Sequence, residues 1–167
     1  MGIMGKVWKY GDDINTDVIF PGKYTYTITD QNEIAEHALE DLDPEFAGKV
    51  NKNDVIIAGE NFGCGSSREQ AATCLKFAGV GAVVAKSFSR IFFRNAINQA
   101  LPVIECKEAV DYIKSGEEVE IDFEKGEISC DNKIFRFSPL PAEILEIFTD
   151  GGLIPHTKKI LKKEKGE

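Results

Sequence analysis

Two serines and an arginine, Ser66, Ser67 and Arg68, are the residues of this chain best suited to chemistry, and they end a glycine-rich turn. An apolar run at residues 54–58 predicts a buried strand before the turn, and residues 69–78 predict a helix after it. Glycines at such a turn let the backbone fold tightly and approach a ligand. The first turn of a helix attracts anions, and a guanidinium binds a carboxylate through two parallel hydrogen bonds. The sequence therefore predicts a site for a small carboxylate or phosphate, with a hydroxyl that loses its proton more easily than in water.

This turn differs from two common motifs that also lie between a strand and a helix. It lacks the Gly-Lys-Ser/Thr ending of a Walker loop. It is not the elbow of a hydrolase, because Ser66 follows Gly65 and no glycine stands two residues after it. The chain has only two histidines, His37 and His156, which argues against a Ser–His–Asp triad. A purely structural turn capped by serine stays open as an alternative.

Other reactive side chains have a structural interpretation that we favour. Cys64 in the same turn could be a nucleophile or a redox-sensitive thiol, but a small buried side chain is more common. His37 has charged neighbours and is expected at the surface. Arg90 and Arg94 lie one helical turn apart and could pair with acidic neighbours or hold an interface. Three aromatic residues nearby are expected to pack in a core or against a partner, and these are Phe88, Phe92 and Phe93.

A polar segment near the N-terminus contains Asp12, Asp13, Thr16 and Asp17. These carboxylates could bind a cation, but their spacing is not that of an EF-hand loop. We favour a turn stabilised by hydrogen bonds from side chains to the backbone. Lysines cluster at the other end of the chain, where a solvated helix end or a frayed tail is favoured over a binding patch. They are Lys158, Lys159, Lys162, Lys163 and Lys165.

Length and composition predict one soluble domain over residues 1–167. The chain has 43% apolar and 29% charged residues, which is ordinary for a globular protein. Its net charge of −8 argues against nucleic acid as the main partner. No run is apolar enough to span a bilayer and no signal peptide is visible, so we expect a cytoplasmic protein with reduced thiols. The cysteines form no C-x-x-C pair, so neither a metal site nor an iron–sulfur cluster is expected in this chain alone.

The order of the elements predicts an α/β fold. Strand and helix alternate through the centre of the chain, which is typical of parallel strands joined by crossover helices. The expected strands there are residues 55–58, 82–85 and 102–104, with helices at 69–78, 89–99 and 107–114. Period-2 alternation then predicts antiparallel strands at residues 118–123, 127–129 and 133–137. We also expect a first strand at residues 6–10, a loop at 23–30, and helices at 32–42 and 141–148.

Several segments, taken in order, resemble a known family. They are residues 11–24, the turn at 59–70, residues 87–98 with the Leu-Pro pair that follows, and the ending at 151–154. With these motifs the chain resembles the small subunits of 3-isopropylmalate dehydratase, the swivel-domain partners in the aconitase superfamily, over nearly its whole length. The resemblance implies a swivel-like β/β/α domain with a mostly parallel central sheet plus antiparallel strands.

The resemblance also implies an activity, the isomerisation of 2-isopropylmalate and 3-isopropylmalate in leucine biosynthesis by removing and re-adding water. In the family a separate large subunit carries a [4Fe–4S] cluster that binds the substrate as a Lewis acid, so no cofactor is expected in this chain. Carried over from the family motif, Ser66 is the base that removes the carbon-bound proton, and Gly65, Ser67 and Arg68 hold a substrate carboxylate. The face that carries Ser66 is implied to expose apolar surface, which favours a homo-oligomer when the chain is alone.

The tyrosine- and threonine-rich loop near the N-terminus is implied to set substrate specificity. Aconitase- and homoaconitase-like members place an arginine there, whereas this chain has Tyr24, Thr25, Tyr26 and Thr27. Without that charge an apolar substituent such as isopropyl is preferred, because burying an unpaired carboxylate is costly. Leucine is common after the tyrosine in isopropylmalate members, so Thr25 keeps dimethylmalate, citramalate and homoaconitate open as alternatives. A non-catalytic module that binds an anion, for which Ser66 is dispensable, is a further alternative.

Overall fold

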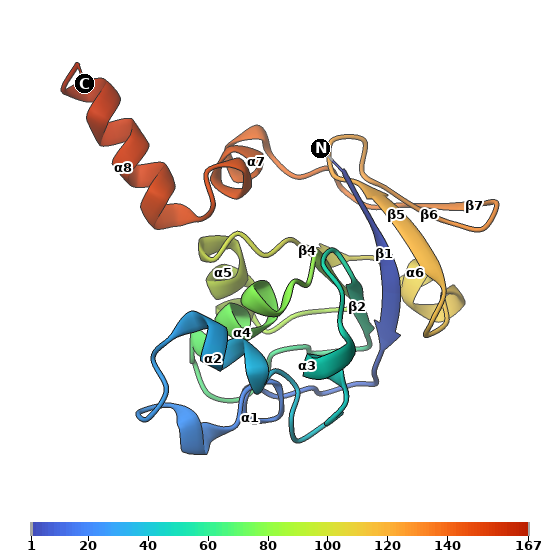
Figure 1. Ribbon diagram of the computed structural model, residues 1–167. Coiled ribbons are helices and arrows are strands. Elements are labelled where there is room, and N and C mark those ends of the chain that lie inside the picture. The colour runs from blue at the N-terminus through green and yellow to red at the C-terminus, as the bar shows by residue number, and fades with distance from the viewer. Residues whose placement is uncertain (1, 167) are drawn as a thin grey trace.

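A curled sheet of seven strands, in the order β4-β3-β2-β1-β5-β6-β7, organises residues 2–166, which are the residues that the computed structural model describes (Figure 1). Strands β1 to β4 run parallel, and β5, β6 and β7 continue the sheet in antiparallel pairs. The predicted α/β fold with parallel and antiparallel parts is thus confirmed. The strands are β1 (Gly2–Lys9), β2 (Val55–Ala58), β3 (Ala82–Ala85), β4 (Val103–Glu105), β5 (Glu118–Asp122), β6 (Glu127–Cys130) and β7 (Lys133–Arg136).

The parallel half is buried on both faces. Alternate residues of a strand point to opposite faces, and the two sets belong to separate cores. Ile56 and Ala58 pack in one core, and Val55 and Ile57 pack in the other. The first core lies under the crossover helices α4 (Gln70–Ala78) and α5 (Arg90–Asn98), and the second contains residues of α6 (Lys107–Tyr112). This two-sided cover explains why these strands read as continuous apolar runs.

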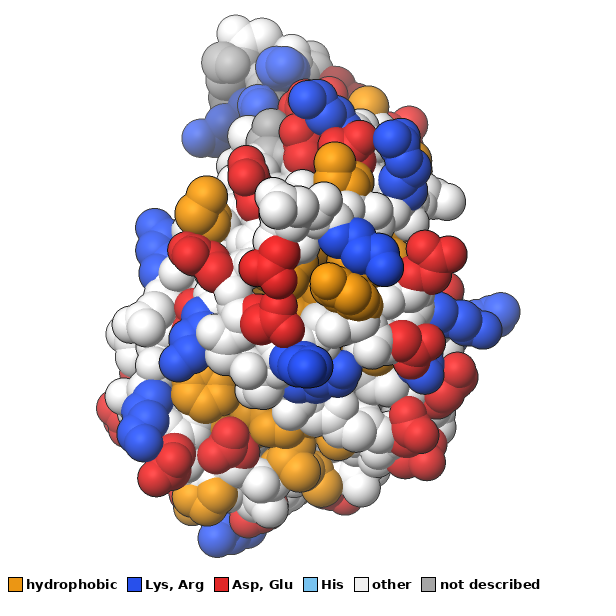
Figure 2. Space-filling model, turned by 90° about the vertical axis from the view of Figure 1, so that its right-hand side faces the viewer, with side chains coloured by type: hydrophobic (Ala, Val, Ile, Leu, Met, Phe, Trp, Pro, Cys, Tyr) orange, Lys and Arg blue, Asp and Glu red, His pale blue; other side chains and the backbone are white. Residues whose placement is uncertain are grey.

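The antiparallel half has one buried face and one solvated face. In β5, Val119 and Ile121 are buried, whereas Glu118 and Glu120 are exposed. This alternation is what the sequence pattern predicts for a half-buried strand. Figure 2 looks onto the side of the molecule that carries the β6–β7 hairpin and α6, where acidic, basic and apolar side chains lie interspersed.

The segment between β1 and β2 covers the first core with four short helical elements. These are α1 (Thr16–Ile19), η1 (Gly22–Tyr24), α2 (Gln31–Glu36) and α3 (Phe46–Lys49). The predicted helix at residues 32–42 is wrong in its second half, because α2 ends at Glu36. Leu39 has a φ of 56° and donates its N–H to the Ile19 carbonyl at 2.8 Å. The apolar spacing thus reflects burial of Leu39 in a turn and not a continued helix.

Two helices follow β7, namely α7 (Ala142–Thr149) and α8 (Leu153–Glu164). Gly152 between them has a φ of 135°, and a Cβ there would lie 2.7 Å from the Asn98 carbonyl oxygen, so only glycine fits this close approach. Helix α8 projects away from the rest of the fold and has no buried residue (Figure 1). Within the single chain the lysine-rich segment is therefore a solvated helix end, as predicted. No helix within residues 2–166 is long and apolar enough to cross a membrane.

Candidate active site

The loop between β2 and α4 is shaped by glycines that no other residue can replace without strain. Gly63 and Gly65 have φ values of 82° and 96°, a region that side chains with a Cβ rarely adopt. A Cβ at position 63 would overlap the side chain of Phe92. Phe92 is buried and stacks edge-on against Phe62 with ring centroids 5.1 Å apart. The aromatic core that the sequence predicted thus sets how closely this loop approaches α5.

The polar segment at residues 12–17, which runs into the start of α1, fixes the backbone of the same loop. Gly63 donates its N–H to the Ile14 carbonyl at 2.7 Å, and Thr16 donates its N–H to the Cys64 carbonyl at 2.8 Å. The Thr16 hydroxyl, which is buried, donates to the Ser66 carbonyl at 2.9 Å. Asn15 caps α1 by accepting the Val18 N–H at 3.0 Å. The predicted turn with side-chain-to-backbone bonds is confirmed, and it serves to position Ser66.

Ser66 and Ser67 are both exposed at the tip of this loop. Within residues 2–166 neither hydroxyl has a hydrogen-bond partner. Helix α4 begins at Gln70, one residue later than predicted, and no side chain caps it, so the serines precede the helix as expected. Their hydroxyls are free to meet a ligand that approaches from outside the chain.

Arg68 already has partners within this chain. Its Nη2 donates to Asp17 Oδ1 at 2.5 Å and to the Phe20 carbonyl at 3.0 Å, and its Nη1 donates to Thr25 Oγ1 at 2.8 Å. Its Nε is buried without a partner in the described part of the chain. The predicted two-bond grip on a ligand carboxylate is therefore not free in this state, because a parallel pair of N–H donors needs at least one of these bonds to exchange.

The predicted specificity loop divides into residues that face the arginine and residues that do not. Thr25 contacts Arg68 directly, whereas Tyr26 is 95% exposed and Thr27 is exposed. Tyr24 turns instead toward helix α2 and stacks on His37 with ring centroids 4.0 Å apart. Of the four residues that the sequence predicted to set specificity, the structure brings only Thr25 to the serine–arginine turn.

His37 and Glu40 hold the other side of this loop. The His37 Nδ1 lies 3.0 Å from Glu40 Oε1, and the Tyr24 hydroxyl donates to the same oxygen at 3.4 Å. The hydrogen bond from His37 lowers the pKa of Glu40 below its ordinary value. His37 was expected at the surface, but its ring is half-buried because Tyr24 covers it.

The cysteines do not gather into a cluster site. All four are free, and Cys64 is half-buried in the serine loop, against the expectation that it is buried. Burial raises the pKa of the Cys74 thiol, and burial with the nearby Glu117 carboxylate raises that of Cys130 to about 12. Glu117, Cys130 and Asp131 are the group within residues 2–166 that could hold an ion, and it has a single thiol. These residues do not fit an iron–sulfur cluster, which needs about three or four thiolates.

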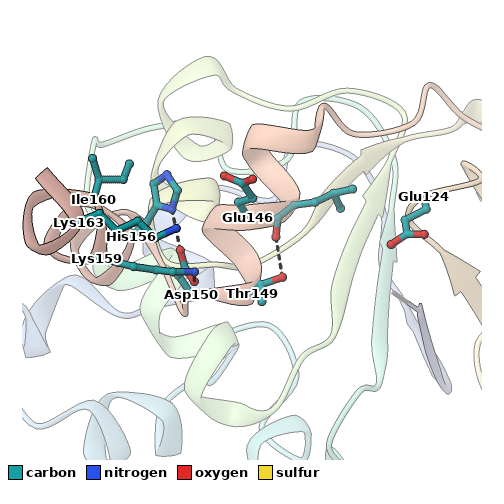
Figure 3. A pocket seen from close by; sticks show the side chains of 9 residues that line it. Glu124, Glu146, Thr149, Asp150, His156, Lys159, Ile160 and Lys163 are labelled. Atoms are coloured by element: carbon teal, nitrogen blue, oxygen red, sulfur yellow. Dashed lines mark hydrogen bonds and ion pairs between the residues drawn. The ribbon is translucent and has the colours of Figure 1, made fainter. Parts of the chain in front are cut away.

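In the part of the chain that the structure describes, the remaining polar groups that the sequence singled out do not contact the serine–arginine turn. Arg90 and Arg94 are exposed on α5 and, within the described residues, form no ion pair with an acidic neighbour. A pocket of about 260 Å³ lies apart from the serine loop, between α7 and α8. Figure 3 shows His156 and Lys159 directed at Asp150 in this pocket, where His156 Nδ1 lies 2.7 Å from Asp150 Oδ2. No residue of the serine–arginine turn lines it.

Comparison with known proteins places this geometry in a family. The Aconitase C-terminal domain family matches residues 12–109, which include both the segment before α1 and the serine loop. The 3-isopropylmalate dehydratase small subunit of Caldicellulosiruptor saccharolyticus is 54% identical over 162 residues, covering 96% of this chain and 93% of the relative. The chain belongs to the family of 3-isopropylmalate dehydratase small subunits. The resemblance expected from the sequence is thereby confirmed.

Further relatives agree in length and in fold. The 3-isopropylmalate dehydratase small subunit 1 of Thermotoga maritima is 53% identical over 159 residues, which is 94% of this chain and 95% of that one. A solved structure of 3-isopropylmalate dehydratase (leuD) from Methanocaldococcus jannaschii superposes with a TM-score of 0.91 at 46% identity, covering all of both chains. The predicted swivel-type fold is confirmed by this match.

Proposed function

We propose that this chain, acting as one swivel-type domain, is the small subunit of a two-chain hydro-lyase that interconverts 2-isopropylmalate and 3-isopropylmalate in leucine biosynthesis. The observation that carries the proposal is the exposed Ser66 hydroxyl beside Arg68, in a chain 54% identical to a 3-isopropylmalate dehydratase small subunit. Ser66 and Ser67 are exposed on the surface, which suits a face that a large subunit completes.

Ser66 acts as the base in this proposal. As an alkoxide, its Oγ takes a proton from one substrate carbon, a carbon–carbon double bond forms, and the hydroxyl leaves from the neighbouring carbon. Rehydration with the opposite orientation returns the proton and places the hydroxyl on the other carbon. Two features support this role. The hydroxyl has no partner within the described residues to compete for it, and Thr16 holds the backbone of Ser66 in place.

The cluster that the family implies belongs to the large subunit. When bound there, it supplies a Lewis acid for the substrate hydroxyl. The dispersed thiols of this chain support that division, because the described residues bring no set of cysteines together. The work of this chain is then to move the proton and to hold the carboxylate.

Arg68, with Gly65 and Ser67, holds a substrate carboxylate. Nη2 already donates to Asp17 and to the Phe20 carbonyl, so the bond to the carboxylate comes from Nη1, and Thr25 is the partner that leaves Nη1. Thr25 lies in a loop whose next residue is almost fully exposed, whereas Asp17 lies on α1, which hydrogen bonds tie to the serine loop. Asp17 therefore stays and orients the guanidinium while Thr25 gives way.

The chemistry of the loop supports an apolar substrate arm. Residues 24–28 contain no arginine to neutralise a further carboxylate. An extra carboxylate in a closed site would be left unpaired at considerable cost. An isopropyl group needs no such partner, so isopropylmalate is the favoured substrate, and dimethylmalate, citramalate and homoaconitate are compared with it below.

An anaerobic mixing assay tests this function. The chain is combined with the cluster-bearing large subunit from the same source, and the unsaturated intermediate is followed by ultraviolet absorbance. Isopropylmalate should turn over only when both chains are present. Faster turnover of dimethylmalate, citramalate or homocitrate, the precursor of homoaconitate, would keep the mechanism and change the substrate. If the complex forms with an intact cluster but turns over none of these acids, the proposed hydro-lyase activity is contradicted. The result would favour a module that binds an anion without catalysis.

A further inference from the structure

Helix α8 has an inner face that is anchored to the fold. His156, Lys159, Ile160 and Lys163 line the pocket against α7 (Figure 3). Lys159 Nζ donates to Asp150 Oδ1 at 3.1 Å, beside the contact of His156 with the same carboxylate. Together with the close approach of Gly152 to its neighbour, these contacts fix the direction in which α8 leaves the fold.

The outer face of α8 is basic, apolar and uncovered. Its residues follow the spacing i, i+4, i+7, i+8 and i+11, which places them on one side of a helix. They are Ile154, Lys158, Leu161, Lys162 and Lys165. The two aliphatic residues of this face are 68% and 48% exposed. A helix of 12 residues is marginal in water by itself, so this face favours a covering partner.

A matching surface exists on the antiparallel half of the same chain. The strand registers align Met4 with Glu120, Glu120 with Ser129, and Ser129 with Ile134, which makes one row across four strands. Met4 is 57% exposed and Ile134 is 54% exposed, and Glu120 lies between them. The row thus presents apolar side chains at its ends and a carboxylate near its middle, on the solvated face of the sheet.

Further carboxylates surround this row. An open groove there is lined by Met4 and Val119 together with four acidic residues, which are Glu117, Glu118, Glu120 and Asp131. Within residues 2–166 neither Glu118 nor Glu120 has an ion-pair partner. Lys6 stands opposite Glu118, but its ammonium lies over the Trp8 ring at 5.9 Å. The groove is therefore acidic where the outer face of α8 is basic.

The overall distribution of charge agrees with this match. Residues 153–167 contain five lysines and two glutamates, a net charge of +3 in a chain of net charge −8. The remaining residues thus carry −11. Opposite charges gathered on two separate parts of one chain attract a second copy of that chain and steer its approach.

We propose that the outer face of α8 docks into the acidic groove on β1, β5 and β6 of a second copy, giving a two-fold dimer with two reciprocal contacts. Ile154 and Leu161 then cover the exposed Met4 and Ile134, and Lys158 and Lys162 face the carboxylates between them. The contact is with another copy because the anchored inner face directs α8 away from its own sheet (Figure 1). Reciprocal contacts close the assembly, so it stops at a dimer. This proposal is independent of the catalytic function.

Sedimentation of the isolated 167-residue chain over a wide range of concentrations tests the proposal. We expect a dimer at low salt that weakens as salt rises, because screening reduces attraction between exposed charges. The double variant K158E/K162E should raise the dimer dissociation constant at least about tenfold, and so should E118K/E120K. The matched control K49E/K52E makes the same change of net charge on and beside α3 and should leave dimerisation unchanged. Circular dichroism verifies that each variant is folded.

The most stringent test mixes the two charge-reversal variants, K158E/K162E and E118K/E120K. In a dimer of either variant alone, like charges face each other at both contacts and repel. In a dimer of one copy of each variant, opposite charges face each other at both contacts. A one-to-one heterodimer should therefore form. A monomeric wild-type chain, dimers that survive both reversals, or a mixture that stays monomeric would each overturn the proposal. Loss of large-subunit binding in K158E/K162E, with a monomeric wild-type chain, would assign α8 to the large subunit instead.

Discussion

Asp17 Oδ1 accepts a hydrogen bond from Nη2 of Arg68 at 2.5 Å, although the two residues are 51 positions apart in the chain. The Asp17 side chain is 66% exposed, whereas the Arg68 side chain is only 14% exposed. The largely buried arginine is therefore held by a carboxylate that solvent reaches. Because α1 is also hydrogen-bonded to the serine loop, this pair links the direction of the arginine to the position of Ser66.

Removing the charge of Asp17 should weaken substrate binding. In Asp17→Asn the guanidinium loses its charged partner, and a hydrogen bond between charged groups contributes about 1.5–3 kcal/mol. We expect KM of the reconstituted enzyme to rise about tenfold or more, with little change in kcat, since Ser66 is untouched. Asp17→Glu should restore part of the loss. A lower KM in Asp17→Asn would contradict this account, because it would mean that Asp17 competes with the substrate.

Replacing Arg68 by lysine should be more severe. An ammonium is a point charge without the planar fork, so it cannot contact Asp17, the Phe20 carbonyl and a substrate carboxylate at fixed angles. KM should rise roughly 10- to 100-fold, and the loop that contains Thr25 should become more susceptible to proteolysis. Arg94→Lys, on the exposed face of α5, is the matched control and should behave like wild type. Equal effects of the two substitutions would exclude the proposed role.

Gly63 should tolerate no side chain. Gly63→Ala combines a positive φ with overlap against Phe92, and together these should cost roughly 2–4 kcal/mol in the free energy of unfolding. Urea unfolding measures this cost. Gly116→Ala is the control, because Gly116 has a φ of 90° but nothing within 4 Å of its added Cβ. That control should lose only about 1 kcal/mol. Similar losses at both positions would contradict the packing of Phe92 on the loop.

The contact between α7 and α8 should weaken in acid. The hydrogen bond from His156, followed by that from Lys159, holds the pKa of Asp150 below its ordinary value of 3.8. A carboxyl whose pKa is lowered by folding stabilises the fold above its unfolded pKa, and this stability is lost as the pH falls through the lower folded value. Urea unfolding from neutral pH to below pH 3.8 should therefore show an acid-dependent loss of stability that is smaller in Asp150→Asn than in the wild type. The exposed Asp41→Asn should keep the wild-type pH dependence, and an unchanged profile in Asp150→Asn would contradict the pairing.

The sequence was sufficient for the alternation of elements and for the loop that carries the serines. Apolar runs and period-2 patterns are set by residues that are close together in the sequence. Elements β2, α4 and β5 to β7 therefore lie where the sequence predicted them. The end of α2 could not be predicted in this way, because Leu39 gives its N–H to Ile19, a partner 20 residues away. The pairing of Asp17 with Arg68 is equally non-local. The sequence indicated it only indirectly, because residues 11–24 and 59–70 are both among the segments that resemble the family.

The most direct test of the account compares Ser66→Ala with Ser67→Ala in the reconstituted two-chain enzyme. Isomerisation of isopropylmalate and exchange of its carbon-bound hydrogen with deuterated solvent are followed together. We expect Ser66→Ala to lose both activities by about 10²–10⁴-fold while the complex still assembles, since this is the usual contribution of a base. Ser67→Ala should keep the exchange and raise KM. Full exchange and turnover in an assembled Ser66→Ala enzyme would contradict the claim that this chain supplies the base.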